Sequence, residues 1–397
     1  MRFYSSLALL AAASLSAAAP AKNAKGGSFF ESPSSSNSAK KIRATPSQRK
    51  LLVGSPGNIT IFSFSAADGF GALASDVLAG SAPSWMAVKG PNTLYAVNEN
   101  SNTIRQLTID TTANTLTPVT EVAASAGAVH LEFTPTGNQL ISSVYGSGVV
   151  DVFSIGDNNN LALQSTWTMG AKGTSNPHQT LIDPSGKFAV TNDLGLNQVV
   201  ITPLGAASSD SSKRVSAPEG CGPRHGAFLP GPSDSTMYAV VCELNNIVVV
   251  YSVAASGSDL ALTEAQTIST FPDGTSKPDA RAGELLASTD GKHVYVSNRL
   301  TGDAQDSITH FLVADGKLTH SQTVPSGGQL PRMMSLPPTC QDQDVLFVGN
   351  QKGDKGLMAL KIGANGEIGD EVASVPISVW GTADTNGPQF VQEISLC

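Results

Sequence analysis

The chain has 397 residues, of which 40% are hydrophobic, 14% are charged and 6% are aromatic, and its formal net charge is −8. This acidic balance, with no basic run longer than Lys40-Lys41, argues against a protein that binds nucleic acid. The low charged fraction beside an ordinary hydrophobic content excludes a disordered acidic chain. With 38 Gly and 23 Pro, the composition favours a β-rich globular protein.

Residues 1–19 have the pattern of a secretory signal. Arg2 precedes a short apolar stretch, and the small residues Ala17, Ala18 and Ala19 follow it before Pro20. The apolar stretch is interrupted by serines and is shorter than the roughly 20 residues of a membrane span. No other segment is apolar enough to cross a bilayer, so we expect a secreted, extracellular protein without a membrane partner.

Residues 20–48 lack apolar periodicity and are expected to form a flexible leader, which leaves residues 49–397 for the folded domain. A glycosylation sequon, Asn58-Ile59-Thr60, lies near the start of that domain. An N-x-Thr sequence in an exported chain is an acceptor for a surface glycan. We therefore expect Asn58 to be glycosylated.

A unit of two short strands and a turn recurs seven times along the domain. Its second strand is an apolar run rich in Val, Tyr and Ala, found at residues 51–53, 94–97, 140–141, 188–190, 237–240, 294–296 and 346–348. The positions just after these strands are separated by 43 to 56 residues. A period of this size with several strands per unit is typical of β-propeller blades. The sequence therefore predicts an all-β, seven-bladed propeller.

The first strand of a unit often begins after a proline, as at Pro177, Pro223 and Pro331. The first unit lacks such a strand before Leu51, but residues 388–394 at the C-terminus have the same pattern. We expect this last strand to pair into the first blade and close the ring, because closure protects sheet edges.

The start of a first strand and the end of a second strand lie at one end of a hairpin, so residues at these positions gather at one mouth of the channel. The strand starts carry His130, His178, Arg224, His225, Glu284 and Arg332. The strand ends carry Asn98, Glu99, Tyr145, Asp193, Glu243, Asn298, Arg299 and Gln351. So dense a set of ionisable groups is either an internal ion-pair network or a site for a charged ligand.

Four cysteines occur in the exported part, and an oxidising compartment favours disulfides. Cys221 and Cys242 lie at adjoining ends of two antiparallel strands, and Cys340 and Cys397 occupy equivalent turns in neighbouring blades. Both pairs can meet the Cα separation of a disulfide, about 4.4–6.8 Å. We predict Cys221–Cys242 and Cys340–Cys397.

Three blocks in order give the chain a family resemblance: Asn176-Pro177-His178, Gly220-Cys221-Gly222-Pro223-Arg224-His225 and Ser297-Asn298-Arg299. From about Leu51 onward the chain resembles the seven-bladed lactonase family, which contains propeller-type 6-phosphogluconolactonase and 3-carboxy-cis,cis-muconate cyclase. The resemblance implies His178, Arg224, Glu243 and Arg299 as the active-site residues, and the register argument also places these four at the mouth. Fold and site transfer across such a family better than substrate does.

The resemblance implies an enzyme that acts on a small anionic lactone or muconate, a cyclase first and a sugar-lactone hydrolase as an alternative. Arg224 and Arg299 suit binding of a carboxylate or phosphate, and His178 suits proton transfer. Glu243 can act as an acid, as a base, or by orienting its neighbours. The remaining mouth residues expected to bind substrate are His130, His225, Asp193, Glu284, Arg332 and Asn298.

Two other interpretations remain beside this one. The mouth carboxylates and amides can in principle hold calcium, but the arginines among them disfavour a cation, and we expect neither a metal nor a cofactor. The alternative to an enzyme is an extracellular glycoprotein propeller that binds a partner or the cell wall and keeps its channel residues as structure.

Overall fold

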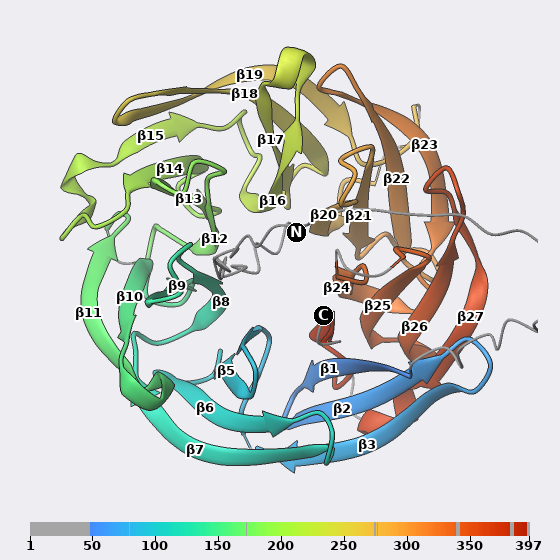
Figure 1. Ribbon diagram of the computed structural model, residues 1–397. Coiled ribbons are helices and arrows are strands. Elements are labelled where there is room, and N and C mark those ends of the chain that lie inside the picture. The colour runs from blue at the N-terminus through green and yellow to red at the C-terminus, as the bar shows by residue number, and fades with distance from the viewer. Residues whose placement is uncertain are drawn as a thin grey trace, which may run out of the picture.

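The structure is a computed structural model that describes residues 48–78, 80–171, 173–273, 275, 277–338, 342–381 and 385–394. Within them, 28 strands form seven antiparallel sheets of four strands each. The sheets are blades around a central channel (Figure 1), so the predicted seven-bladed propeller is confirmed. The signal at 1–19, residues 20–47 of the leader, Cys340 and Cys397 lie outside the described residues.

Each blade is numbered in chain order and its strands run outward from the channel. Blade 1 contains β28 (Phe390–Glu393), β1 (Arg49–Ser55), β2 (Asn58–Ser65) and β3 (Gly69–Val77). Blade 2 contains β4 (Met86–Lys89), β5 (Thr93–Val97), β6 (Thr103–Asp110) and β7 (Thr115–Ala123). Blade 3 contains β8 (Ala128–Phe133), β9 (Gln139–Val144), β10 (Val149–Ile155) and β11 (Leu161–Thr168). Blade 4 contains β12 (Pro177–Ile182), β13 (Phe188–Asp193), β14 (Gln198–Pro203) and β15 (Lys213–Ser216).

The last three blades follow the same order. Blade 5 contains β16 (Pro223–Pro230), β17 (Thr236–Cys242), β18 (Ile247–Ser256) and β19 (Asp259–Ser269). Blade 6 contains β20 (Arg281–Ala287), β21 (His293–Arg299), β22 (Ser307–Ala314) and β23 (Lys317–Pro325). Blade 7 contains β24 (Gln329–Ser335), β25 (Val345–Lys352), β26 (Lys355–Ile362) and β27 (Ile368–Pro376). The short 3-10 helices are η1 (Asp157–Asn159), η2 (Ser209–Ser211), η3 (Pro232–Asp234) and η4 (Ile377–Trp380).

The burial of each strand follows its place in the blade. All five residues of β5 and all six of β13 are buried, whereas the outer strand β7 is mostly exposed. An inner strand is covered on both faces by the neighbouring blades, so it reads as a continuous apolar run rather than an alternating one. This is why the second strands were recognisable in the sequence and why the core lies between blades.

The C-terminal strand closes the ring, as the sequence predicted. β28 pairs with β1, with Phe390 opposite Gly54 and Glu393 opposite Leu51. Gly54 is required there, because a Cβ atom at this position would come within 2.2 Å of the Pro83 carbonyl oxygen. The rings of Phe64 and Phe347 then meet edge to face at 5.1 Å between blades 1 and 7. Closure therefore combines backbone pairing with an aromatic contact between the first and last blades.

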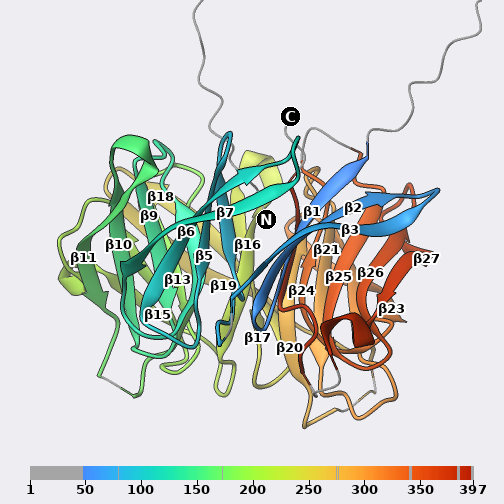
Figure 2. The ribbon, with the colours of Figure 1, turned by 90° about the horizontal axis from the view of Figure 1, so that it is seen from below.

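Seen edge-on, the molecule is a disc whose strands run across its thickness (Figure 2). We call the face where β12, β16, β20 and β24 begin, and where β13, β17, β21 and β25 end, the mouth. Over the described part of the chain, no helix has the length and apolarity needed to cross a membrane.

Candidate active site

The inner strands of blades 4 to 7 each carry a β-bulge at the mouth. His178 is the extra residue of the bulge in β12, and Arg332 is the extra residue in β24. Arg224 and His225 share the bulge in β16, and Glu284 lies in that of β20. A bulge bends its strand and redirects the side chains it contains. The bulges therefore explain why five ionisable side chains converge on the mouth.

Three of these side chains form a hydrogen-bonded chain across blades 4, 5 and 6. Nε2 of His225 lies 3.0 Å from Nδ1 of His178, and Nδ1 of His225 lies 3.0 Å from each carboxylate oxygen of Glu284. All three side chains are nearly fully buried. His225 and Glu284, which the sequence predicted as substrate contacts, are thus the inner members of a chain that leads to His178.

Burial decides the protonation of this chain. Burial lowers the pKa of both His178 and His225 well below the usual histidine value, and the Arg224 guanidinium lowers both further. Burial also raises the pKa of Glu284 to about 8, although Arg224 acts in the opposite direction. Both imidazoles are therefore neutral near neutral pH, and the nitrogen of His178 that carries its proton depends on the hydrogen bonds of the chain.

Two arginines share one carboxylate beside this chain. Oε2 of Glu243 lies 2.9 Å from Nε of Arg224 and 3.0 Å from Nη2 of Arg299. Burial acts to raise the pKa of Glu243, but Arg299 and Arg224 outweigh it and the net pKa is lowered. Glu243 is therefore ionised at neutral pH and anchors both guanidinium groups, which favours the orienting role over that of an acid.

Arg224 is the most unusual group of the site, because only 2% of it is exposed. Its Nη1 atom is buried without a hydrogen-bond partner in the described part of the chain. A buried donor that lacks an acceptor costs free energy, and more so when the group is charged. An anion bound next to Arg224 would supply the acceptor.

A third arginine closes the rim on the opposite side. Nη2 of Arg332 lies 2.7 Å from Oε2 of Glu99, so an ion pair links blade 7 to blade 2 past the inner end of blade 1. Both side chains are partly exposed. Arg332 therefore reaches the mouth, as predicted, where its guanidinium is paired with the Glu99 carboxylate.

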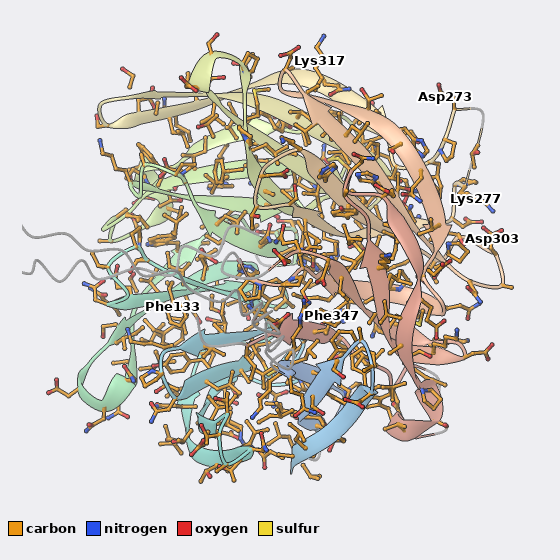
Figure 3. The ribbon with its side chains drawn as sticks, turned by 45° about the vertical axis from the view of Figure 1, so that its right-hand side comes forward. Phe133, Asp273, Lys277, Asp303, Lys317 and Phe347 are labelled. Atoms are coloured by element: carbon orange, nitrogen blue, oxygen red, sulfur yellow. A yellow bond between two sulfur atoms is a disulfide. The ribbon has the colours of Figure 1, made fainter. Side chains whose placement is uncertain are left out.

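A further ion pair, farther from the channel, involves the loop that leads into blade 6. Nζ of Lys277, in the loop after β19, lies 2.7 Å from Oδ1 of Asp303, in the loop after β21. The two side chains lie next to each other at the edge of the molecule (Figure 3). This pair ties the segment before β20, and hence before Glu284, to the rest of its blade.

Sequence reasoning did not give Trp85 a role, yet this residue fills the channel below the site. Its ring centroid lies 4.3 Å from that of His130, 5.5 Å from that of His225 and 5.5 Å from that of Phe390. His130 is completely buried against it. Pro83-Ser84-Trp85 has the strand-start pattern of the other blades, so the register argument could have found it. His130 is therefore part of the channel floor, below the residues that reach the mouth.

Tyr145 was noted at a strand end but was given no role. Its ring meets the ring of His178 edge to face, with centroids 5.8 Å apart. About a third of Tyr145 remains exposed, 36% of its surface. Tyr145 therefore forms an accessible wall beside the histidine.

Asp193 and Asn298 do not fit the predicted role of substrate contacts. The carboxylate of Asp193 accepts hydrogen bonds from the backbone of Asn176 and from Ser175 Oγ, both at 2.8 Å. The side-chain amide of Asn298 donates to Thr309 Oγ1 at 3.1 Å. Asn98 and Asn350 make similar ties at the equivalent positions of blades 2 and 7. A polar residue that recurs at one register position is typical of a structural tie between a blade and its loop.

The disulfide between Cys221 and Cys242 is confirmed, with Cα atoms 4.5 Å apart. Both cysteines are fully buried, and the pair joins the segment before Arg224 to the residue before Glu243. The bridge therefore ties together the two segments that carry Arg224 and Glu243. The predicted Cys340–Cys397 bridge stays a prediction, since both cysteines lie outside the described residues.

Among the residues that the structure describes, no three His, Cys, Asp or Glu side chains are grouped as metal ligands. Glu243 is held by two arginines and Asp193 by its own loop, so neither presents the open oxygen cluster that calcium binds. The site instead combines cationic groups with a neutral histidine. Such a combination is suited to anion binding and proton transfer.

Comparison with known proteins identifies the family to which the propeller belongs. The family model "Lactonase, 7-bladed beta-propeller" matches residues 44–380. A protein of Arthroderma benhamiae named "Probable 6-phosphogluconolactonase" is 32% identical over 312 residues, covering 74% of this chain and 78% of that protein. The 6-phosphogluconolactonase of Bacillus subtilis is 26% identical over 273 residues, covering 65% and 74% respectively.

The fold is also that of a solved structure, the periplasmic gluconolactonase PpgL of Pseudomonas aeruginosa. The TM-score is 0.74 at 23% identity, and the match covers 88% of this chain and 99% of that one. The family match spans most of the propeller and includes the mouth residues of blades 4 to 6. This chain therefore belongs to the lactonase family of seven-bladed β-propellers.

Proposed function

We propose that this protein hydrolyses a sugar-acid lactone that carries a second anionic group, with 6-phosphogluconolactone as the first substrate to test. The observation that carries the proposal is the buried guanidinium of Arg224 with an unpartnered Nη1, next to Arg299 and to a neutral His178. Arginine binds phosphate and carboxylate bidentately, so this side of the mouth suits an anionic substrate.

The curated relatives support the same choice. The A. benhamiae and B. subtilis proteins reported above carry the name 6-phosphogluconolactonase. None of the relatives described above is named as a muconate cyclase, so cyclase activity, which the sequence put first, becomes the second activity to test. Lactone hydrolysis requires a base that takes a proton from water and a cation that stabilises the developing oxyanion.

His178 is the base in this proposal. When His225 Nε2 accepts a hydrogen bond from His178 Nδ1, the Nε2 atom of His178 is left unprotonated. This atom takes a proton from water as the water oxygen attacks the lactone carbonyl carbon. The same proton then passes to the ring oxygen as the carbon–oxygen bond of the lactone breaks, which yields the hydroxy acid.

The arginines stabilise charge in the two places where it appears. One guanidinium lies near the developing oxyanion and the others hold the fixed anionic group of the substrate. Glu243 keeps Arg224 and Arg299 in position, since both contact the same carboxylate oxygen. Fixed positions matter because a preorganised charge needs no rearrangement during the reaction.

The test is a lactonase assay of the purified protein, with spontaneous hydrolysis subtracted. We expect turnover of 6-phosphogluconolactone, a kcat/KM at least about tenfold lower for unphosphorylated gluconolactone, and a further loss in Arg299→Ala through KM. Equal rates on both lactones would contradict the anionic preference. Turnover of 3-carboxymuconolactone alone would replace hydrolysis with the cyclase activity, and normal folding without any turnover would favour a binding protein.

We also propose that the protein acts outside the cell. The signal pattern of residues 1–19 and the buried Cys221–Cys242 disulfide both suit an oxidising compartment. Recovery of the protein from the culture medium, and a glycosidase-sensitive mass that is lost in Asn58→Gln, would support export and glycosylation. Retention inside the cell with a free N-terminal methionine would contradict export.

A further inference from the structure

We infer that Glu284 and His225 form a proton relay for His178, so that His178 acts first as a base and then as an acid without carrying a positive charge. The inference rests on the proposed lactone hydrolysis. Glu284 and His225 do not act on the substrate themselves. They act through His178 and are positioning residues.

The hydrogen bonds allow two arrangements of the protons. With Glu284 ionised, His225 Nδ1–H donates to the carboxylate, His178 Nδ1–H donates to His225 Nε2, and His178 Nε2 is a free base. With Glu284 protonated, the direction reverses: its hydroxyl donates to His225 Nδ1, His225 Nε2–H donates to His178 Nδ1, and His178 Nε2 carries a proton. One proton on Glu284 therefore decides whether His178 is a base or an acid.

The catalytic cycle uses both arrangements. A proton taken from water enters at His178 Nε2, the Nδ1 proton of His178 moves to His225 Nε2, and the Nδ1 proton of His225 moves to Glu284. Both rings stay neutral and Glu284 becomes a neutral acid. Release of the Nε2 proton to the lactone ring oxygen reverses the three transfers, so the relay returns to its starting state and no proton is gained or lost.

The surroundings favour moving the proton to Glu284 rather than leaving it on an imidazole. The charged groups that face the chain are Arg224 on β16, Arg299 on β21, Arg332 on β24 and Glu243 after β17. The other titratable groups packed against it are His130 on β8, whose ring lies 6.2 Å from that of His225, and Tyr145 after β9. Three cations nearby and full burial oppose an imidazolium, and burial also favours a neutral Glu284. A buried carboxylate that takes the proton removes a charge from the interior instead of adding one.

The relay also sets the pH dependence. Burial raises the pKa of Glu284 to about 8, so the base form of His178 predominates above that pH and the acid form below it. Activity that begins with general-base attack should rise as the pH increases through this value. Because the three groups are coupled, the midpoint belongs to the chain as a whole.

The decisive experiment needs no substrate. The ring nitrogens of ¹⁵N-histidine-labelled protein are observed by NMR at pH 6.5 and pH 9.5, with His178→Gln and His225→Gln for assignment. We expect two neutral rings at both pH values, with His178 protonated at Nδ1 at high pH and at Nε2 at low pH. An imidazolium at pH 6.5, or the same tautomer at both pH values, would overturn the relay.

Kinetics test the same idea with a matched pair of variants. Glu284→Gln should lose the pH-dependent change of tautomer and lower kcat by roughly 10²-fold with KM within about threefold, a loss in the range of general acid–base catalysis. Glu121→Gln makes the same chemical change on the exposed outer strand β7 and should match the wild type. A Glu284→Gln enzyme that folds normally with unchanged kcat and pH profile would refute the relay. If no lactone is turned over while the tautomers change as expected, the hydrolysis proposal fails and the proton relay stands.

Discussion

The two sides of the channel wall have the same strand order but differ in strand register and in the kind of side chain. The inner strands of blades 4 to 7 are bulged and present His178, His225, Glu284 and the arginines. The inner strands β28 and β4 of blades 1 and 2 pair with their neighbours without a register shift. They bring Phe390 and Trp85, both buried, to the channel.

The difference shows how a ring of similar blades produces one asymmetric site. Trp85 comes from blade 2 and touches His225 of blade 5, so the apolar side fills the channel beneath the ionisable side. Aromatic filling keeps water away from the histidine–glutamate chain, and a drier site strengthens its electrostatic interactions. The charged side carries the ionisable groups, and the apolar side supplies part of the buried environment in which their pKa values shift.

The largest effect is expected for the charged side, from His178→Ala. Loss of the proposed base should lower kcat on 6-phosphogluconolactone by about 10³-fold, while thermal unfolding changes little. The matched control is His320→Ala, since His320 lies on the outer strand β23 and bonds to Thr323. Equal losses of activity in the two variants would contradict the role given to His178.

On the apolar side, replacement of Trp85 should change the stability of the fold. Trp85→Ala removes a large buried ring that three other rings contact, and the cavity should lower the free energy of unfolding by about 3–5 kcal/mol. Trp85→Phe keeps most of the volume and should cost less than about 1.5 kcal/mol. Denaturant unfolding of both variants measures the difference. Similar values for the two would show that Trp85 does not fill the channel as described.

Removal of the disulfide tests how much the bridge contributes to stability and to the position of Arg224 and Glu243. Replacing Cys221 and Cys242 together with alanine should lower the free energy of unfolding by about 3 kcal/mol, because the bridge closes a loop of 21 residues. The Arg224–Glu243 pair, which directly follows the bridge, should loosen and raise KM by a few fold. Unfolding within about 1 kcal/mol of the wild type would show that the bridge adds little to the blade.

The smallest effect is expected from Glu99→Gln in blade 2, because the Glu99 carboxylate forms an ion pair with Arg332. Glu99→Gln removes a partly exposed ion pair and should change stability by less than about 1 kcal/mol. It also removes a negative charge beside an anion site, so KM for the phosphorylated lactone should fall by up to about threefold. A rise in KM would mean that Glu99 positions Arg332 for binding rather than competing with the substrate.

Much of the fold was predictable because the strands that carry it are buried on both faces. Such strands are apolar runs in the sequence, and the number and spacing of these runs predicted seven blades. The C-terminal strand was predictable for the same reason, since residues 388–394 repeat a pattern that the first blade lacks. The Cys221–Cys242 bridge followed from strand register, which places Pro223 directly opposite Cys242.

The site was only partly predictable. Register placed these residues on one face, but it treated Asp193 and Asn298 like His178 and Glu284. The structure separates them: Asp193 and Asn298 bond within their own blade or to the loop beside it, whereas His178 and Glu284 are linked through His225 across three blades. Recurrence was the missed signal, because Asn or Asp appears at that strand end in blades 2, 4, 6 and 7 while the histidine–glutamate chain appears once.

The sequence by itself determined the number of blades, the closing strand, one disulfide and the face on which the ionisable residues gather. These depend on periodic burial and strand register, which are local properties of the chain. Only the tertiary structure decided which side chains touch, because a bulge of one residue redirects a side chain and contacts between blades join positions about 50 residues apart. The histidine–glutamate chain forms only when blades 4, 5 and 6 pack side by side, and the same packing buries Arg224.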